Sequence, residues 1–381
     1  MRFATFARLN KWLYPMTLEH LSIFNYRNIA EASLDFSSGV NCLTGANGQG
    51  KTNLLDAIYF LSFCKSAGGA TDSMNIRHGE ESFMLSGTYT ADNGTQEKIT
   101  CATRIGQRKL FRRNDKAYGR LSEHIGVIPL VMISPGDQEL ISGVSEARRK
   151  LMNAVISQYD GKYLSVTMRY ERTLRQRNAL LRDEAPIDPT VMTVLEEMMS
   201  EDAAVIYEAR QAFVEEFTPF FEQIYRALCP DEGEVPTIAY QSHSSRGPLA
   251  ALLSEYRERE RIVGHTLHGP HRDDLVFNLG GYAVRHEGSQ GQTKTFFIAL
   301  KLAQYDFLRT KGERRTPILL LDDIFDKLDT ERVARIVRYV SSGMPGQVFI
   351  TDTDRSHVDR ILAGLDGNYR HFHVEGGSIS E

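Results

Sequence analysis

Eight consecutive residues near the beginning of the chain have the composition of a phosphate-binding loop. Gly45-Ala46-Asn47-Gly48-Gln49-Gly50-Lys51-Thr52 matches the Walker A pattern G-x-x-x-x-G-K-[ST], and Asn53 follows it. Glycines let backbone N–H groups converge on phosphate oxygens, the lysine binds the outer phosphates, and the hydroxyl binds Mg²⁺. We therefore predict that residues 45–53 bind ATP, that Lys51 takes part in catalysis and that Thr52 is a magnesium ligand.

A pair of carboxylates follows an apolar run late in the chain. Ile318 to Leu321 is followed directly by Asp322 and Asp323. Such a run is typical of a buried parallel strand, whose end would bring the two acids to the phosphate loop. We predict that Asp322 binds magnesium and that Asp323 is catalytic, as the group that polarises an attacking water. The alternative is that Asp323 only caps the following helix.

The stretch Ser289-Gln290-Gly291-Gln292 distinguishes this chain from many other proteins with a phosphate loop. It lies about thirty residues before the apolar run and opens a predicted helix, where it resembles the L-S-G-G-Q signature of ABC-type ATPases. In that superfamily the signature of one subunit covers the ATP held by another. The resemblance therefore implies that all four residues contact ATP across a dimer, although the tetrapeptide alone is also a common helix-capping turn.

Three further elements of that superfamily are matched less completely. Asp326 and Asp329, shortly after the carboxylate pair, resemble the D-loop, which implies a position near the nucleotide at the dimer interface. Gln138 is a candidate for the Q-loop glutamine. No histidine directly follows the apolar run 348–351: Asp352 stands there, and His357 comes several residues later. The identity of the switch residue therefore stays open.

The segments around these motifs predict an α/β protein. Apolar and polar residues alternate from Met16 as in half-buried strands, and a short strand and a helix flank the phosphate loop. Helical spacing of apolar residues extends from Glu146 to about Arg182 and from Met192 to Leu228. We predict an ABC-type P-loop ATPase head, a mixed sheet with an antiparallel amino-terminal subdomain, that contains an inserted, mostly helical lobe.

The predicted division of the chain has four parts. Residues 1–15 lack the apolar segment and cleavage site of a signal peptide, and form an extension that is either frayed or the product of an upstream start codon. Residues 16–125 form the first half of the head, and residues 126–262 form the helical lobe. Residues 263–381 complete the head with the signature, the carboxylate pair and the D-loop.

Two further segments narrow the resemblance to the RecF family. They are Leu18-x-x-Leu21-x-Ile23-x-Asn25-Tyr26-Arg27-Asn28 and His268-Gly-Pro-His271-Arg272-Asp273-Asp274, and with the motifs above the resemblance extends from Met16 to about Asp354. It implies ATP-dependent dimerisation on DNA, slow DNA-stimulated ATP hydrolysis, and action with RecO and RecR at single-strand gaps. It also implies that Arg27 and Asn28 contact ATP. Residues 268–274 are either a structural turn or part of a nucleotide or DNA site.

Two basic clusters are candidate DNA contacts. Residues 104–120 hold seven basic residues against one acid, interleaved with Phe111 and Tyr118, as in surfaces that follow a phosphate backbone. A second cluster at the base of the predicted lobe continues through Arg169, Arg172, Arg175 and Arg177. The alternative is that both clusters are solvated faces. The candidates are Arg108, Lys109, Arg112, Arg113, Arg148, Arg149 and Lys150.

The overall composition limits the remaining function classes. A formal net charge of −4 gives no general attraction for nucleic acid, so a DNA surface must be local. No stretch reaches the roughly 20 apolar residues that span a bilayer, and the four cysteines lack zinc-site or disulfide spacing. We expect a cytoplasmic protein without a membrane partner. An ABC transporter subunit and an SMC-like DNA-organising protein, which would need much longer arms, are the alternatives.

Overall fold

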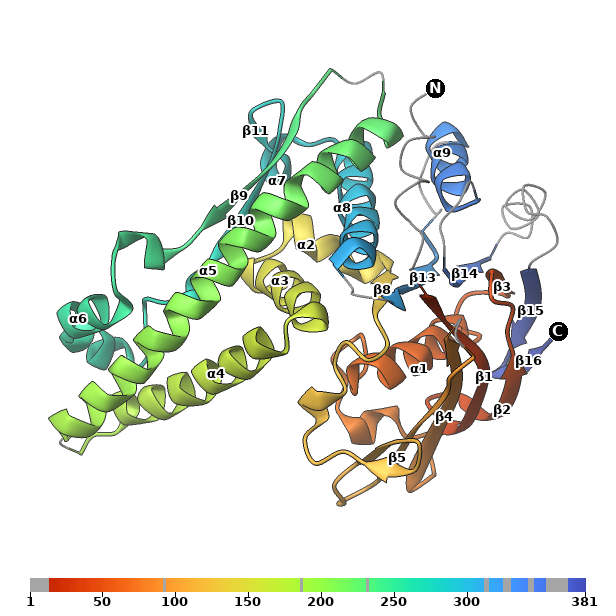
Figure 1. The fold of residues 1–381 in the computed structure, drawn as a ribbon, viewed down its shortest axis with the longest axis horizontal. Coiled ribbons are helices and arrows are strands. Elements are labelled where there is room, and N and C mark those ends of the chain that lie inside the picture. The colour runs from red at the N-terminus through yellow and green to blue at the C-terminus, as the bar shows by residue number, and fades with distance from the viewer. Residues whose placement is uncertain are drawn as a thin grey trace. The chain divides into compact units, whose positions relative to one another are not determined.

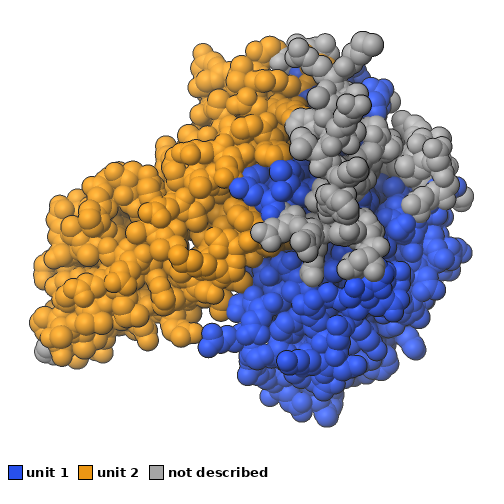
Figure 2. Space-filling view, viewed as in Figure 1, with its two compact units in different colours: residues 1–137, 227–229, 301–381 blue, residues 138–226, 230–300 orange. Residues whose placement is uncertain are grey.

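The computed structural model describes residues 14–91, 94–185, 188–230, 233–311, 315–324, 330–341, 346–353 and 369–381, which Figure 1 shows. The chain divides into two compact units, coloured separately in Figure 2. Unit 1 comprises residues 1–137, 227–229 and 301–381, and unit 2 comprises residues 138–226 and 230–300. This division differs from the predicted one, because unit 2 begins at residue 138 rather than 126 and continues through the tetrapeptide 289–292.

A largely antiparallel sheet forms one layer of unit 1. Its strands alternate between buried and exposed residues, as in β5, where every second residue faces the core. The first strand begins at Tyr14, inside the predicted extension, because Tyr14 and Pro15 pair with Arg315 and Thr316. The strands are β12 (Arg315–Thr316), β1 (Tyr14–Tyr26), β4 (Ser82–Ala91), β5 (Gln96–Arg104), β6 (Leu110–Arg113) and β7 (Lys116–Ala117), with β2 (Ile29–Asp35) paired to β1.

A second, largely parallel sheet carries the motif residues of unit 1. Every residue of β3, β8, β13 and β14 is buried, as expected for continuous apolar runs covered on both faces. The apolar runs predicted as parallel strands are therefore confirmed. The sheet order is β16 (Ser378–Ser380), β15 (Tyr369–Glu375), β3 (Val40–Thr44), β14 (Val348–Asp352), β13 (Ile318–Asp322) and β8 (Leu130–Ile133).

Helix α1 (Lys51–Phe63) lies between the two sheets. It contacts β1, β4 and β5 of the antiparallel sheet and β8, β13 and β14 of the parallel sheet. Ten of its 13 residues are buried, which explains why its sequence is apolar on nearly every face. Unit 1 also contains α9 (Thr330–Ser341) and short 3₁₀ turns at Asp72–Asn75 and Leu121–Glu123, and a third turn at Pro135–Gln138 spans the boundary at residue 138.

Unit 2 is mostly helical, as predicted for the lobe. The long apolar stripes form α3, α4 and α5, and the first stripe is divided where Asp160 caps α4 by accepting a hydrogen bond from the Tyr163 N–H at 2.9 Å. Although α5 runs for 40 residues, no helix within the described ranges has both the length and the apolarity of a membrane span. The helices are α2 (Glu139–Ser142), α3 (Ser145–Tyr159), α4 (Gly161–Arg182), α5 (Pro189–Leu228), α6 (Leu249–Val263) and α7 (Val284–Glu287).

A small antiparallel sheet completes unit 2. Its order is β11 (Tyr282–Ala283), β10 (Asp274–Leu279) and β9 (Pro236–Gln241), with 3₁₀ turns at His243–Arg246 and Pro270–Arg272. Helix α8 (Gln290–Lys311) follows, and the boundary between the units falls between its residues Leu300 and Lys301. Residues 227–229, which include the end of α5, belong to unit 1.

Candidate functional site

The phosphate loop joins β3 to α1, which is the strand–loop–helix context that the motif requires. Two of its glycines are needed for steric reasons. Gly45 has φ +154°, and a Cβ there would lie 2.2 Å from the carbonyl oxygen of Val374. Gly50 has φ +118°, and a Cβ would lie 2.8 Å from the Asn28 side chain. Only glycine fits these backbone conformations and close approaches.

Gln49 anchors the loop to two turns that are distant in sequence. Its carbonyl accepts hydrogen bonds from Asn28 Nδ2 at 3.0 Å and from the Gly377 N–H at 2.9 Å. Its side-chain oxygen accepts from the Gly376 N–H at 2.6 Å. The loop is thus held by the turn between β1 and β2 and by the turn between β15 and β16. The contact with the turn between β15 and β16 could not be predicted from the sequence, because a Gly-Gly pair does not indicate which loop it will contact.

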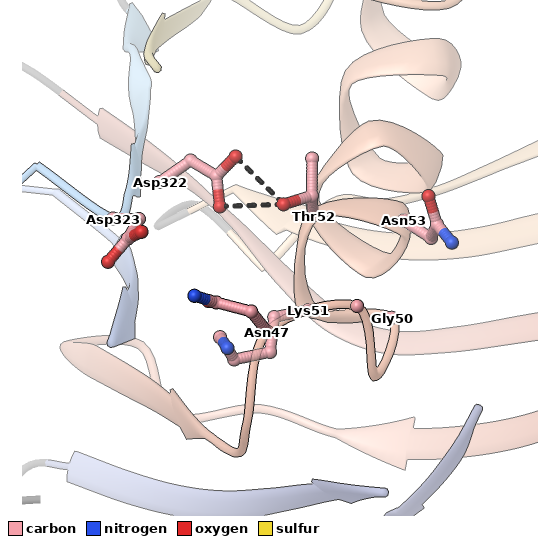
Figure 3. Close-up of a pocket in the computed structure, with 8 residues that line it drawn as sticks. Asn47, Gly50, Lys51, Thr52, Asn53, Asp322 and Asp323 are labelled. Carbon is pink, nitrogen blue, oxygen red and sulfur yellow. Dashed lines mark hydrogen bonds between the residues drawn. The ribbon is translucent and has the colours of Figure 1, made fainter. Parts of the chain in front are cut away.

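Thr52 contacts Asp322 at the carboxyl end of β13 in the parallel sheet (Figure 3). Thr52 Oγ1 donates to Asp322 Oδ1 and Oδ2 at 3.1 and 3.0 Å. These are the hard oxygen ligands that magnesium prefers, so the residues present fit the ion. Among the described residues, no group of three or more His, Cys, Asp or Glu side chains is placed to hold a metal ion.

A pocket brings the phosphate loop and the carboxylate pair together. In Figure 3 the Lys51 ammonium and the Asp323 carboxylate reach into the same space from opposite sides. The parallel register explains this arrangement, because the ends of β3, β14 and β13 lie side by side. The lining residues are Asn47, Gly48, Gly50, Lys51, Thr52, Asn53, Asp322 and Asp323.

The Lys51 side chain is buried at the mouth of the loop. It is 6% exposed, and Nζ donates to the carbonyl oxygens of Gly45 and Ala46 at 2.5 and 3.0 Å. Burial lowers its pKa, while the nearby carboxylates, Asp323 first and then Asp322 and Asp352, oppose that change. Asp352, one candidate for the switch position, therefore contributes to the field at Lys51.

Thr351 connects the two carboxylate residues. Its hydroxyl donates to Asp322 Oδ1 at 2.7 Å and accepts from the Asp323 N–H at 3.0 Å. Burial raises the pKa of Asp322, and the hydrogen bonds from Thr351 and Thr52 oppose that rise. Asp323 has φ +47°, an uncommon left-handed conformation for a residue other than glycine. The role of Thr351 could not be predicted from the sequence, because the apolar run predicts a strand but does not indicate which strand pairs with it.

Arg27 and Asn28 support the loop from the side of α1. The Arg27 guanidinium contacts Asp56 Oδ2 and Ser66 Oγ, both at 2.8 Å, and Asn53 Oδ1 at 3.1 Å. Asn28 Oδ1 accepts from Asn53 Nδ2 at 2.7 Å. Neither residue lines the pocket. Their predicted contact with ATP stays a prediction, while their observed contacts hold the loop and the first turn of α1.

Ser289 and Gln292 form a reciprocal cap at the start of α8. The Gln292 N–H donates to Ser289 Oγ at 3.2 Å, and the Ser289 N–H donates to Gln292 Oε1 at 2.9 Å. This cap uses the Ser289 hydroxyl as an acceptor and leaves its O–H able to donate. The predicted D-loop residues Asp326 and Asp329, and the alternative switch residue His357, lie outside the described residues.

Residues 268–274 are bound into the interior of unit 2. Asp273 Oδ2 accepts from Arg210 Nη1 at 2.7 Å, and His271 Nδ1 lies 2.7 Å from the hydroxyl oxygen of Tyr170. Burial lowers the pKa of His271 to about 4. These contacts support the interpretation of residues 268–274 as a structural turn, which was one of the alternatives that the sequence left open.

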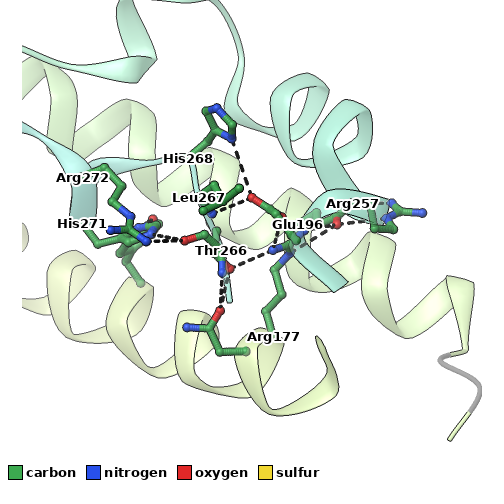
Figure 4. Close-up of polar contacts among 11 residues, drawn as sticks. Arg177, Glu196, Arg257, Thr266, Leu267, His268, His271 and Arg272 are labelled. Atoms are coloured by element: carbon green, nitrogen blue, oxygen red, sulfur yellow. Dashed lines mark hydrogen bonds and ion pairs between the residues drawn. The ribbon is translucent and has the colours of Figure 1, made fainter. Parts of the chain in front are cut away.

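A buried ion network lies beside that segment (Figure 4). Arg177 is fully buried and contacts Glu196 Oε1 at 2.9 Å, Glu260 Oε2 at 2.7 Å and Thr266 Oγ1 at 2.8 Å. Arg257 also pairs with Glu196. The network joins α4, α5 and α6 to the residues that precede β10. Arg177, included in the basic cluster by sequence, is thus an internal residue.

Two of the predicted DNA contacts, Lys109 and Arg148, instead bind other residues of the protein. Lys109 Nζ donates to the Cys64 carbonyl at 2.6 Å and to Asp72 at 2.9 Å. Arg148 is 4% exposed and forms a two-point ion pair with Asp274, with distances of 2.6 and 3.0 Å. Both cations are neutralised by partners in their own unit, so we leave them out of the proposed DNA surface.

The other candidate DNA contacts differ in whether their side chains already have partners within the chain. Arg113 pairs with Glu97 at 2.6 Å, and Lys150 pairs with Glu146 at 2.7 Å on the surface of α3. Arg149 donates to Ser145 Oγ at 2.6 Å and to the Asp273 carbonyl at 2.8 Å. The side chains of Arg108 and Arg112 are exposed and form no hydrogen bond or ion pair with another described residue. Among the candidate contacts of the first cluster, these two are the exposed cations without a partner in the described part of the chain.

Comparison with known proteins gives a consistent result over nearly the whole chain. The family model described as the RecF/RecN/SMC N terminal domain matches residues 17–380. The DNA replication and repair protein RecF of Phocaeicola vulgatus is 50% identical over 366 residues, which cover 96% of this chain and 98% of that protein. RecF of Porphyromonas gingivalis is 46% identical over 365 residues, covering 96% and 100%.

Solved structures share the fold. A structure described as the recombination mediator protein RecF-ATPrS in the RecFOR pathway has a TM-score of 0.86 at 28% identity, covering 97% of this chain and 99% of that chain. An SMC head domain from Pyrococcus furiosus has a TM-score of 0.57 at 17% identity, covering 96% and 95%, which is a likeness of fold alone. The predicted ATPase-head fold is confirmed, and the chain belongs to the RecF family of DNA replication and repair proteins.

Proposed function

We propose that this chain is an ATP-dependent switch in DNA repair and replication recovery. ATP binding would join two copies on DNA, at a duplex or a gap junction, and slow hydrolysis would release them. The switch would support loading of a recombinase at single-strand gaps together with RecO and RecR. The family relationship supports the repair role, and the pocket of residues 45–53 with Asp322 and Asp323 supports the nucleotide chemistry.

The observation that carries the proposal is the contact between Thr52 and Asp322 beside Lys51. In the proposed site, phosphate oxygens replace the Gly45 and Ala46 carbonyls as acceptors for the Lys51 ammonium. Backbone N–H groups of the loop and the first turn of α1 bind the same phosphates. Magnesium held by Thr52 and Asp322 would withdraw charge from the outer phosphates.

Asp323 is the proposed residue that positions and polarises the attacking water. Its place at the pocket, opposite Lys51, supports this role. An aspartate has a shorter reach than a glutamate, which fits a slow reaction that depends on a well-placed water. Helix capping, the other interpretation of Asp323, does not require a carboxylate that faces the pocket.

The proposed dimer uses the residues at the start of α8. The free O–H of Ser289 and the N–H groups of the first turn of a long helix suit the γ-phosphate held by a second copy. Gln290 and Gly291 lie in this turn, and Gln292 completes the cap. Asp326 and Asp329 are proposed to cross the same interface, as the D-loop resemblance implies.

The DNA surface is proposed to be local. In unit 1, Arg108 and Arg112 supply accessible positive charge, and Arg113 would add to it after releasing Glu97. In unit 2, Arg149 and Lys150 would form a separate contact after releasing their present partners. An SMC-like organiser would need long helical arms, and α4, with 22 residues, and α5, with 40, are short by comparison. An ABC transporter subunit would act on a membrane partner, for which no described residue gives support.

One experiment tests the proposal as a whole. Sedimentation velocity would be measured for the wild type and Lys51→Met with ATP, ADP and no nucleotide, each alone and with duplex, single-stranded or gapped DNA at stated salt. We expect an ATP-dependent dimer that binds DNA in the wild type and a nucleotide-independent monomer in Lys51→Met. An identical shift in both proteins would refute the nucleotide site, and the absence of DNA binding would refute the repair role.

A further inference from the structure

Thr351 occupies a central position in the parallel sheet. It is fully buried in β14, where it stands opposite Asp322 of β13 on one side and Leu43 of β3 on the other. Opposite residues of neighbouring strands project from the same face, which brings the Thr351 hydroxyl to the Asp322 carboxylate. The contact is therefore a consequence of strand register and does not depend on a mobile loop.

The hydroxyl acts on both carboxylate residues in different ways. Its O–H donates to Asp322 Oδ1 at 2.7 Å, while Thr52 Oγ1 is 3.0 Å from Oδ2. Because Thr52 Oγ1 also lies 3.1 Å from Oδ1, the bond from Thr351 restrains the rotation of a carboxylate whose two oxygens both face Thr52. The oxygen lone pair of the same hydroxyl accepts the Asp323 N–H at 3.0 Å. One buried group thus uses its donor and its acceptor on consecutive residues.

The second contact matters because of the backbone at Asp323. A φ of +47° is sterically unfavourable for an aspartate and persists only where the surroundings hold it. The Asp323 N–H bond to Thr351 is such a restraint, because it fixes the peptide plane that directs the side chain into the pocket.

We propose that Thr351 is the positioning residue of the carboxylate pair, which sets Asp322 for magnesium and Asp323 for the attacking water through a single hydroxyl. This inference rests on the proposed ATPase site and goes beyond it, since it assigns a role to a residue that is not part of the pocket lining. Loss of the hydroxyl would leave the sheet intact while both carboxylates gain freedom.

The test compares Thr351→Val, which keeps the shape and removes the hydroxyl, with Thr351→Ser, which keeps the hydroxyl. Thr103→Val is the matched control, because Thr103 is a buried threonine in β5 that is absent from the pocket lining. For each full-length protein, binding of a fluorescent ATP analogue in EDTA, kcat, KM and the Mg²⁺ concentration for half-maximal turnover would be measured.

We expect Thr351→Val to lower kcat by about tenfold or more and to raise the half-maximal Mg²⁺ concentration several-fold, because small displacements of catalytic groups are costly. Analogue binding in EDTA should stay within about twofold of the wild type, since the phosphate loop is untouched. Thr351→Ser should retain most activity, and Thr103→Val should have wild-type kinetics even if its melting temperature falls.

Wild-type kcat and Mg²⁺ dependence in Thr351→Val would overturn the inference, as would an equal loss in Thr351→Ser. If the valine variant does not fold, Thr351→Cys replaces the hydroxyl with a weak donor, and unchanged kinetics in that variant would have the same meaning. A wild-type protein that neither binds nor hydrolyses ATP would instead refute the proposed function, so the two failures are distinguishable.

Discussion

Thr52 and Asp322 are hydrogen-bonded at 3.0 and 3.1 Å although 270 residues separate them in the chain. The contact joins the first turn of α1 to the end of β13, and so joins the phosphate loop to the carboxylate pair. Neither motif alone defines the proposed metal site, because each supplies only one of the two proposed magnesium ligands. The proposed function depends on this contact between the two motifs.

Asp323→Asn should abolish turnover while keeping the fold. Asparagine tolerates a left-handed backbone, so the φ of +47° is retained and only the carboxylate charge is lost. We expect ATP hydrolysis to fall by roughly 10²-fold to 10⁴-fold, the usual contribution of a general base. The ATP-bound dimer should accumulate, which sedimentation with ATP would detect. Wild-type turnover in this variant would leave Asp323 as a helix cap only.

Ser289→Asp should separate the capping role of Ser289 from its proposed contact with ATP. Aspartate is as good an N-cap as serine, so α8 should keep its first turn. Its negative charge would repel a phosphate across the dimer interface. We expect ATP binding by the monomer to be unchanged and dimer formation to be lost in sedimentation. Ser289→Thr, which keeps both the cap and the hydroxyl, is the control, and equal dimerisation of both variants would contradict the interface.

Arg108→Ala and Arg112→Ala should weaken DNA binding in a salt-dependent manner. Each exposed arginine that neutralises a phosphate contributes about one unit to the slope of log K against log salt. We expect each substitution to reduce that slope by about 1 in fluorescence anisotropy titrations with duplex DNA. Lys109→Ala is the matched control, because its partly buried ammonium is already paired with Asp72. Unchanged slopes in both arginine variants would exclude this surface.

Arg177→Met should strongly destabilise unit 2. Removing the guanidinium leaves Glu260 buried without its arginine partner and leaves Glu196 paired with Arg257 alone, and breaking a buried ion pair in this way typically costs about 3–5 kcal/mol. Urea denaturation followed by circular dichroism would measure the loss. Lys150→Met breaks an exposed pair with Glu146 and should change stability by less than about 1 kcal/mol. Adding Glu260→Gln to Arg177→Met should recover part of the loss by removing one buried charge.

The stability of unit 1 should decrease in mild acid through His124. Its ring contacts the Leu61 carbonyl oxygen at 2.7 Å and the Tyr118 hydroxyl oxygen at 2.9 Å, and burial lowers its pKa to about 4. Because this value lies below the unfolded-state pKa of about 6.5, the stabilisation is complete above pH 6.5 and is lost as pH falls towards 4. The maximum loss is on the order of 3 kcal/mol.

His124→Gln should therefore flatten the dependence of unfolding free energy on pH between about 6.5 and 4. Urea titrations at several pH values would measure the slope. His78, which is exposed, provides the control, since His78→Gln should leave the slope unchanged. His271 contributes pH dependence of the same sign in unit 2. A slope that is identical in the wild type and His124→Gln would show that this ring is not the titrating group.

Sequence reasoning identified the motifs because their chemistry is local. The phosphate loop needs glycines, a lysine and a hydroxyl within eight residues, and the carboxylate pair follows one continuous strand. The role of Thr351 could not be predicted in this way, because it depends on which strand lies beside β14. The burial of individual cations could not be predicted from the sequence either. Arg148 and Arg177 resemble surface cations in the sequence. Their ion pairs explain why they are internal, and the partners are Asp274 for Arg148 and Glu196 and Glu260 for Arg177.

The order of the parallel sheet has a consequence during synthesis. Strand β3, which leads into the phosphate loop, pairs with β14 on one side and β15 on the other, and its residue Val40 pairs with Val348 and Tyr369. At about 5–20 residues per second, a ribosome reaches these partners roughly 15–60 seconds after it has made β3. Throughout that interval the loop lacks both neighbouring strands and the Gly376–Gly377 turn. A nascent chain should therefore be unable to capture ATP until translation of its last strands is complete.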